Sequence, residues 1–245
     1  KALRKLVIEV SVIIPKYKVA GFTYPEKLPG TDIPVFYVEN DTYFGDGTVY
    51  PGGEAEHQRF AYFSRAVVDF LDTRAFEPEV IHCHDYHTAL IPDILKEQRK
   101  KVATVLTIHD LSNEGISPAG ILDTALLSSS KLRVLDWDLS DFNVDMILQG
   151  IVSADVINTV SPTYSREIMT KERGEGLSEV LLSREARVFG ILNGIDSEEF
   201  VPVRDKYLAA RFPPKIHDSK VSGKTYLDEV IKAKSANKVA LQKKL

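Results

Sequence analysis

Three histidines and one carboxylate lie close together in the segment Val80-Ile81-His82-Cys83-His84-Asp85-Tyr86-His87. An apolar run ends in these polar residues, and a segment of helical character follows at once. In a parallel α/β sheet, a turn from a strand to a helix belongs to the edge where ligands bind. Imidazole is also the side chain that titrates closest to neutral pH. The segment is therefore the first candidate for a reaction centre or a binding site.

Two interpretations of this cluster differ in whether it holds a metal. Histidines two and three positions apart can converge on zinc, and the spacing is similar to the His-x-His-x-Asp-His box of metallo-β-lactamase-like hydrolases. Here, however, Asp85 comes one place early, and Tyr86 stands where the carboxylate belongs. The remaining histidines, His57, His109 and His217, form no second set of ligands. We therefore expect no metal, and a zinc-dependent hydrolase ranks third among the functions considered below.

In the metal-free interpretation, the cluster binds a sugar or a phosphate through His87. This residue is expected in the first turn of the following helix, where the positive end of the helix disfavours its protonation. A neutral imidazole can donate one hydrogen bond to a sugar hydroxyl and accept another. His82 and His84 are expected instead to be hydrogen-bonded packing residues near the end of the strand.

The elements that must position these residues follow from the spacing of apolar residues. The expected strands are Glu9–Ile14, Val35–Val38, Val80–Cys83, Val102–Ile108, Val156–Val160 and Val188–Leu192. The expected helices are Glu54–Phe76, Thr88–Lys100, Asp141–Val152 and Pro162–Met169. Strands that alternate with helices predict an α/β fold, with a Rossmann-like parallel sheet and helices on both faces.

Polar residues that follow these strands should meet at one edge of the sheet. Right-handed crossovers place the carboxyl ends of all the strands on the same side. Besides the histidine cluster, the residues expected at this edge are His109, Asp110, Ser161, Asn193 and Asp196. Ser161 also precedes a proline and can cap the next helix, while Asn193-Gly194 has the composition of a tight turn.

The composition of the 245 residues excludes several classes of protein. A formal net charge of −4 argues against a general nucleic-acid binder, which needs a basic surface. A single cysteine, Cys83, allows no intrachain disulfide and fits a reducing compartment. The chain has no run of 18 apolar residues that could span a membrane and no pattern of a signal peptide. Because it lacks an initiator methionine, it is expected to begin within a longer protein.

Three other segments have simpler interpretations. The stretch from Asp41 to Gly53 is rich in glycine but lacks a phosphate-loop motif, so a mobile surface loop is expected. On the following helix, Arg59 and Arg65 are expected to be exposed and Phe60 to lie in the core. The lysine-rich segment from Tyr226 to Leu245 is expected to be mostly helical.

A series of motifs along the chain resembles the N-terminal half of the bacterial, archaeal and plant glycogen and starch synthases. The motifs occur in the order of that family and cover nearly the whole chain, with the weakest match between Gly120 and Asp141. The matching segments are Tyr37–Phe44, Arg59–Ala66, Val80–Ala89, Thr107–Leu111, Thr159–Tyr164, Gly174–Leu177, Ile191–Asp196 and Asn237–Gln242.

The resemblance implies a retaining glucosyltransferase of the two-domain (GT-B) type. Residues 1–200 would form the Rossmann-like N-terminal domain, and residues 201–245 a linker and the start of the second domain. The family's first strand and its Lys-x-Gly-Gly-Leu segment would precede Lys1, and its cationic phosphate clamp would follow Leu245. On this basis the chain carries half an active site and is expected to be inactive alone.

The resemblance also assigns roles to individual residues. His87 corresponds to the active-site histidine that contacts the transferred glucosyl unit. His109 corresponds to the histidine of a Thr-x-His-Asn stretch, in which Asp110 here replaces the asparagine. Glu114 and Gly115 would line the acceptor side, and Ser161 would contribute to substrate binding.

The expected reaction transfers glucose from ADP-glucose to the non-reducing end of an α-1,4-glucan, in the cytoplasm or, in a plant, in the plastid. The partners are the sugar nucleotide and the α-glucan, with no cofactor, metal, nucleic acid or membrane. The sequence leaves open UDP-glucose as the donor and the oligomeric state. A non-catalytic carbohydrate-binding module is the second candidate function, and the zinc-dependent hydrolase is the third.

Overall fold

The computed structural model describes residues 2–73, 76–128, 138–196, 201–212 and 223–244. The chain forms two compact units, Lys1–Leu192 and Asn193–Leu245, and each is considered by itself. The candidate residues other than Asn193 and Asp196 belong to the first unit. The domain boundary expected after residue 200 stays a prediction.

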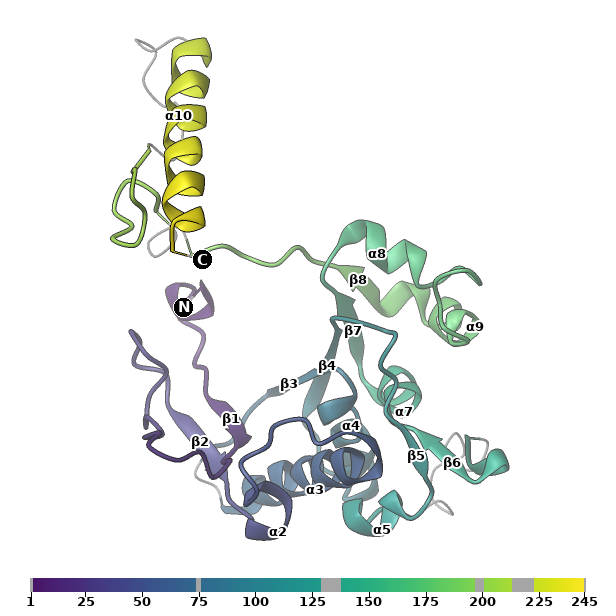
Figure 1. The fold of residues 1–245 in the computed structure, drawn as a ribbon. Coiled ribbons are helices and arrows are strands. Elements are labelled where there is room, and N and C mark those ends of the chain that lie inside the picture. Colours follow the sequence, from purple (N-terminus) through teal and green to yellow (C-terminus); the bar gives the residue numbers. More distant parts are fainter. Residues whose placement is uncertain (1, 74–75, 129–137, 197–200, 213–222, 245) are drawn as a thin grey trace. The chain divides into compact units, whose positions relative to one another are not determined.

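The first unit is built on a four-stranded parallel sheet (Figure 1). Its order is β3-β4-β7-β8, formed by β3 (Val80–His84), β4 (Ala103–Ile108), β7 (Val156–Thr159) and β8 (Val188–Gly190). Valine, isoleucine and threonine dominate these segments, as is typical of strands. The registers pair His84 with Thr107 and Thr107 with Asn158, so the carboxyl ends of the first three strands are level.

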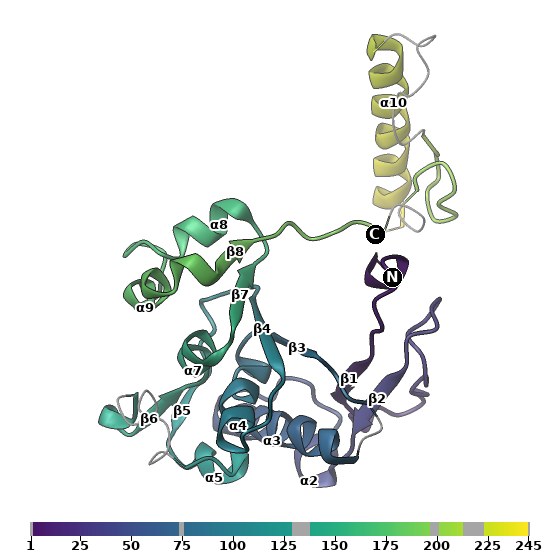
Figure 2. The ribbon, with the colours of Figure 1, turned by 180° about the vertical axis from the view of Figure 1, so that it is seen from behind.

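Helices flank this sheet, so the predicted α/β class is confirmed (Figure 2). The long helix α3 (Gly53–Phe70) continues into η1 (Leu71–Thr73), and α4 (Ile91–Glu97) and α7 (Met146–Ser153) follow β3 and β6. Their apolar side chains and the strand residues Cys83, Leu106, Ile108 and Ile157 form a continuous core. Alternate residues of β3, namely Val80, His82 and His84, are exposed.

The first two strands form a separate sheet, which differs from the single sheet expected. Here β1 (Val12–Pro15) pairs in parallel only with β2 (Val35–Val38), and among the described residues no strand links β1 to β3. The short helix α1 (Ala2–Lys5) precedes them. After β2 comes α2 (Asp41–Phe44), where the Asn40 side chain accepts hydrogen bonds from the amides of Thr42 and Tyr43.

The sequence patterns did not predict a small antiparallel pair between β4 and α7. Strand β5 (Ile116–Pro118) pairs with β6 (Asn143–Asp145), and α5 (Ile121–Ala125) and η4 (Leu139–Asp141) lie between them in the chain. The helix expected from Asp141 therefore begins five residues later, at Met146. Asp145 sets this start because its side chain accepts the amide proton of Leu148, as a helix N-cap does.

The remaining elements follow the sequence more closely. The helix α8 (Pro162–Glu167) follows β7 and ends two residues earlier than expected, and α9 (Ser178–Ser183) and η5 (Glu185–Arg187) precede β8. In the second unit, α10 (Gly223–Gln242) confirms the helix expected near the C-terminus. His217 lies outside the described residues. No helix in the described parts of the chain is long and apolar enough to cross a membrane.

Candidate functional site

His87 lies at the carboxyl edge of the sheet, as expected, but not in the first turn of an α-helix. It belongs to the 3-10 turn η2 (Tyr86–Thr88), and α4 begins only at Ile91. The turn follows Asp85, whose φ of 49° is a left-handed conformation that few residues other than glycine adopt. The side chain of Asp85 accepts the amide proton of His109 at 2.7 Å, which ties this reversal to the end of β4.

Aromatic rings surround the imidazole of His87 and fix its orientation. The ring centroid of Phe60 lies 4.4 Å from that of His87, edge-on, and that of Tyr86 lies 4.0 Å away. The exposed ring of Tyr50, from the glycine-rich loop, lies 5.7 Å away. Burial lowers the pKa of His87, against the opposing effect of the carboxylates of Asp85 and Glu56. The imidazole is therefore held neutral by its surroundings rather than by a helix terminus.

One atom of His87 has no partner in the described part of the chain. Its Nε2 is buried and makes no hydrogen bond there. Buried polar atoms in proteins are nearly always hydrogen-bonded, so an exception of this kind calls for an explanation such as a ligand. Because the chain itself covers Nε2, a substrate would have to displace the neighbouring side chains to bind this atom.

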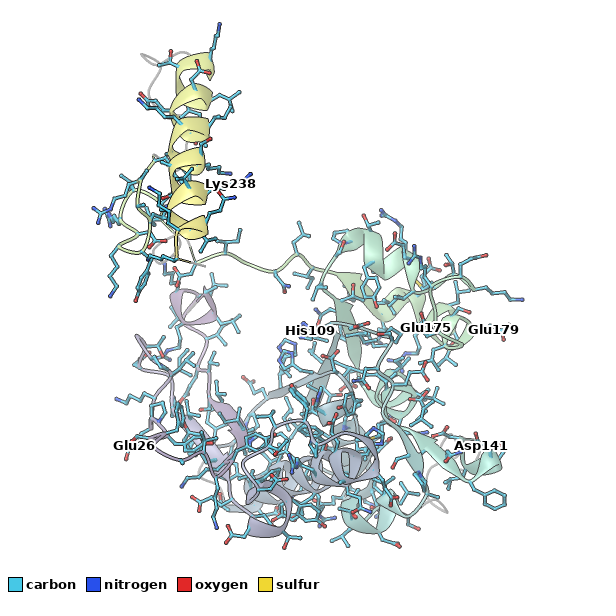
Figure 3. The ribbon with its side chains drawn as sticks, viewed as in Figure 1. Glu26, His109, Asp141, Glu175, Glu179 and Lys238 are labelled. Atoms are coloured by element: carbon cyan, nitrogen blue, oxygen red, sulfur yellow. The ribbon has the colours of Figure 1, made fainter. Side chains whose placement is uncertain are left out.

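His82, His84 and His109 form a chain of imidazoles on β3 and at the end of β4, with the ring centroids of His82 and His84 4.4 Å apart. Nδ1 of His84 lies 3.1 Å from Nε2 of His109, and Nε2 of His82 lies 2.6 Å from the hydroxyl of Thr107. Figure 3 labels His109 near the upper ends of the strands, where β4 and β7 lie side by side in Figures 1 and 2. The hydrogen bonds expected for His82 and His84 are present, but both residues are exposed, so the packing role expected for them is wrong.

The loop after β4 carries Asp110, Glu114 and Gly115. Asp110 is exposed, and its carboxylate accepts hydrogen bonds from the amide and the hydroxyl of Ser112 at 3.0 and 2.8 Å, which lower its pKa. This carboxylate therefore shapes the loop. Gly115 is buried with a φ of 71° and packs against the ring of Tyr86.

Glu114 is half-buried and interacts with Asp145 at the start of α7. Burial raises the pKa of both carboxyl groups, that of Asp145 to about 7, and the hydrogen bond between them raises the pKa of Asp145 and lowers that of Glu114. Each of the two carboxyl groups therefore favours its protonated form more than an exposed carboxyl group does. Glu114 lies on the side of the site where the resemblance places the glucan.

Ser161 follows β7 and caps α8. Its hydroxyl accepts the amide protons of Thr163 at 3.2 Å and Tyr164 at 3.4 Å. The hydroxyl of Tyr164 in turn accepts the amide proton of Leu111, so α8 also braces the loop after β4. The capping role expected for Ser161 is present, and its role in substrate binding stays a prediction. Asn193 and Asp196 belong to the second unit.

Sequence reasoning missed Arg59, which was expected to be exposed and is only 4% exposed. Its guanidinium donates to both carboxylate oxygens of Asp46, at 3.1 and 3.0 Å, and to the carbonyls of Thr48 and Val49. The glycine-rich loop is therefore held by a buried arginine, and its residues are positioned against the site. The spacing of Arg59 on an amphipathic helix gave no signal of this, because its partners come from the loop.

Two further observations concern metal ligands and cavities in the described residues. Among them, no group of three or more His, Cys, Asp or Glu side chains is placed to hold a metal ion. Two cavities of about 330 and 290 Å³ open at the opposite edge, where the strands begin, and share Lys96, Ser153 and Asp155. Arg184 beside them donates to the carbonyls of Val152 and Ala154 at the end of α7. The guanidinium of Arg184 thus complements the partial negative charge at the C-terminus of α7.

Comparison with known proteins supports the fold. A solved structure, the catalytic domain of starch synthase IV from Arabidopsis thaliana bound to ADP and acarbose, superimposes with a TM-score of 0.74 and 28% identity. The match covers 86% of this chain and 50% of that one. The parallel sheet flanked by helices is thus that of a GT-B glycosyltransferase domain.

Sequence comparison identifies the family. Residues 1–183 match the model of the starch synthase catalytic domain, so the chain belongs to this family. It is 39% identical over 226 residues to a glycogen synthase of Geotalea daltonii, covering 87% of this chain and 43% of the relative. It is 33% identical over 270 residues to the glycogen synthase of Bacillus subtilis, covering 98% of this chain and 55% of the relative. The chain thus spans about half the length of these relatives.

Proposed function

We propose that the full-length protein containing this chain is a retaining glucosyltransferase that extends an α-1,4-glucan. It takes glucose from ADP-glucose and adds it to the non-reducing end of the chain, without a cofactor or a metal. The observation that carries the proposal is the family match over residues 1–183, which includes His87 in a site of suitable geometry. We also propose a cytoplasmic location for the protein.

His87 would contact the transferred sugar from the side of this unit. Its unpaired Nε2 would bind a sugar hydroxyl once the substrate displaces the side chains that cover this atom, and the rings of Phe60 and Tyr86 pack against the imidazole. Burial keeps the ring neutral, so Nε2 can carry a proton and donate it in a hydrogen bond. Fixed donors aimed at developing charge stabilise a transition state because they need no reorganisation during the reaction.

The rest of the reaction follows from the proposed family chemistry. The nucleoside diphosphate would leave through an oxocarbenium-like transition state. Cations in the rest of the full-length protein would stabilise the leaving phosphate. Glu114, whose carboxyl group interacts with that of Asp145, would form a hydrogen bond with a hydroxyl of the incoming glucan. The structure of the Arabidopsis relative with ADP and acarbose supports both substrate classes, a nucleotide and an oligosaccharide.

The test measures incorporation of labelled glucose into glycogen by the full-length protein, with ADP-glucose and UDP-glucose as alternative donors. We expect His87→Ala to lower turnover about a hundredfold, as the loss of one transition-state hydrogen bond does. The urea midpoint of unfolding should change little. The control is His82→Ala, which removes an exposed imidazole from the preceding strand and should leave turnover close to wild type.

Each outcome separates the candidate functions. Glucan binding without transfer by the wild type would favour the non-catalytic binding module. Near-wild-type turnover of His87→Ala, or loss of activity caused only by unfolding, would remove His87 from its proposed role.

A further inference from the structure

Tyr86, the residue before His87, connects the 3-10 turn to the start of α3. Its side chain is fully buried, and its hydroxyl donates a hydrogen bond to Oε1 of Glu56. Glu56 is itself only 8% exposed, and its Oε2 accepts the amide proton of Gly52 at 2.9 Å. One buried carboxylate therefore joins the His87 turn to the last residue of the glycine-rich loop before α3.

The same tyrosine ring also supports the loop after β4. A Cβ atom added at Gly115 would lie 2.6 Å from Cδ2 of Tyr86 and 2.8 Å from its Cβ, closer than real side chains approach. Glycine is therefore required at this position by contact as well as by its φ of 71°. On its other side the ring lies 4.0 Å, between centroids, from the imidazole of His87. Tyr86 thus touches both His87 and the segment expected to line the acceptor side.

The chemistry of the pair makes this connection strong. A hydrogen bond from a hydroxyl to a carboxylate is charge-assisted, and it is stronger than one between neutral groups. Burial and the neighbouring carboxylate of Glu56 raise the pKa of Tyr86, so its hydroxyl keeps its proton and acts as the donor. Without the hydroxyl, the amide of Gly52 would be the remaining hydrogen-bond donor to the Glu56 carboxylate in the described part of the chain. A buried charge without its partner is costly, so the surrounding segments would shift.

We propose that Tyr86 and Glu56 are positioning residues that act as one unit to hold His87 and the Gly115 loop in register for transfer. This inference rests on the proposed function, and it adds two residues to which neither the motifs nor the comparisons assign a role. Neither side chain is expected to touch the substrate, and both act through His87. Rates of enzymes are sensitive to displacements of about 1 Å at the reacting atoms, so a small shift of this ring is sufficient.

The variants are made in the full-length protein and assayed for transfer from ADP-glucose to glycogen. Tyr86→Phe keeps the ring against Gly115 and removes only the hydroxyl. We expect its kcat to fall about tenfold, with the KM for donor and acceptor changed less than about twofold, because positioning acts on the transition state more than on binding. Glu56→Ala should have a similar effect. Glu56→Gln retains one acceptor oxygen and should recover part of the loss.

The matched control is Tyr24→Phe, which removes a hydroxyl that donates at 2.5 Å to the carbonyl of Tyr17, in the same unit but outside the site. Its kcat should equal that of the wild type. The double variant Tyr86→Phe/Glu56→Ala should lose no more than the worse single variant, because residues that act as a unit are not additive. Urea midpoints of all variants verify that they are folded, and if Tyr86→Phe is unfolded, the comparison of Glu56→Gln with Glu56→Ala decides.

The outcomes distinguish this inference from the proposed function. A wild type that transfers no glucose overturns the proposed function. An active wild type whose folded Tyr86→Phe variant retains full kcat overturns the positioning pair alone. Additive losses in the double variant, or a change confined to KM, would also overturn it.

Discussion

Nδ1 of His84 lies 3.1 Å from Nε2 of His109, so two imidazoles at the ends of neighbouring strands share one hydrogen bond. One nitrogen must donate and the other must accept, because two protonated nitrogens would repel each other. The contact therefore depends on at least one unprotonated ring. The histidine cluster is in this way linked to the loop after β4, and its geometry should respond to pH.

The first prediction concerns this response. Partial burial, followed by the nearby rings of His82 and His109, lowers the pKa of His84 from 6.5 to about 4. A histidine whose pKa is lowered by folding binds fewer protons in the folded state than in the unfolded state, so stability is lost as the pH falls from 6.5 towards 4. Urea midpoints of the full-length protein should therefore decrease across this range.

The variant His84→Gln cannot take up this proton and should show a flatter dependence of the urea midpoint on pH. The comparison variant is His57→Gln, which removes a histidine outside the imidazole chain whose pKa is also lowered by burial. It should flatten the profile less than His84→Gln does. A His84→Gln profile as steep as that of the wild type would contradict the assignment.

The second prediction concerns Arg59, whose guanidinium holds the glycine-rich loop through Asp46, Thr48 and Val49. Lysine has no fork of donors and cannot bind both carboxylate oxygens and two carbonyls at once. Arg59→Lys should therefore release the loop, lower turnover, and destabilise the protein by about 1–3 kcal/mol through buried groups left unpaired.

A second arginine on the same helix provides the control for this variant. Arg65 pairs with Asp69 one turn further on, in a partly exposed ion pair that should contribute less than about 1 kcal/mol. Arg65→Lys is expected to leave turnover and the urea midpoint almost unchanged. Equal effects of the two substitutions would mean that Arg59 has no special role at the loop.

Local patterns were sufficient to predict the strands of the four-stranded sheet, because apolar β-branched runs mark buried strands without reference to the rest of the chain. They also placed His87, His109 and Ser161 at one edge, since the direction of parallel strands decides this. The position of His87 in a 3-10 turn was not predictable from its own segment. It depends on the backbone reversal at Asp85, whose carboxylate binds the amide of His109, 24 residues away.

The features that the sequence did not predict have a common physical cause, which is contact between distant segments. The spacing of Arg59 on an amphipathic helix predicts an exposed side chain. It is buried because the glycine-rich loop folds over it. Asp145 is part of a helical pattern, but the pairing of Asn143–Asp145 with β5 delays the start of the helix. The sequence does not predict the hydrogen bond between Tyr86 and Glu56, because 30 residues separate them. Such contacts require the three-dimensional structure.

The third prediction concerns Gly115, where a methyl group would collide with the ring of Tyr86. Gly115→Ala must displace either the loop or the ring, and it also places a side chain at a φ of 71°. We expect turnover to fall about tenfold or more, because the displaced ring lies against His87. Gly176→Ala is the matched control, since its φ is 86° but no atom lies within 4 Å of the added Cβ.

The control separates the cost of backbone strain from the contact with Tyr86. Gly176→Ala should lose some stability and retain turnover, whereas Gly115→Ala should lose both. If the two variants show the same kcat, contact between Gly115 and Tyr86 has no part in positioning His87.

The fourth prediction concerns Asp93, a carboxyl group in the core between α4 and α7. It is 1% exposed, its Oδ1 accepts a hydrogen bond from the hydroxyl of Ser153, and its Oδ2 has no partner in the described part of the chain. Burial raises the pKa of Asp93 from 3.8 to about 7, against the opposing effects of Ser153 and Lys96. The folded state therefore favours the protonated carboxyl group.

The sign of the pH effect is opposite to that of His84. A carboxyl group whose pKa is raised by folding contributes stability that is fully present below pH 3.8 and is lost as the pH rises through about 7. Asp93→Asn stays neutral and keeps an oxygen for the hydroxyl of Ser153. It should therefore equal the wild type in stability near pH 4 and exceed it near pH 8, by up to about 4 kcal/mol.

Urea midpoints at a series of pH values test this difference, with the exposed Asp123→Asn on α5 as the control that should not alter the profile. Because Asp93 lies at the helix interface and not at the carboxyl edge of the sheet, turnover at neutral pH should be unaffected by the substitution. A stabilised Asp93→Asn variant with full turnover would mean that this buried carboxyl group destabilises the fold and is not required for transfer. An Asp93→Asn variant less stable than wild type at pH 8 would instead show that the ionised carboxylate is bound by groups that strengthen the contact between α4 and α7.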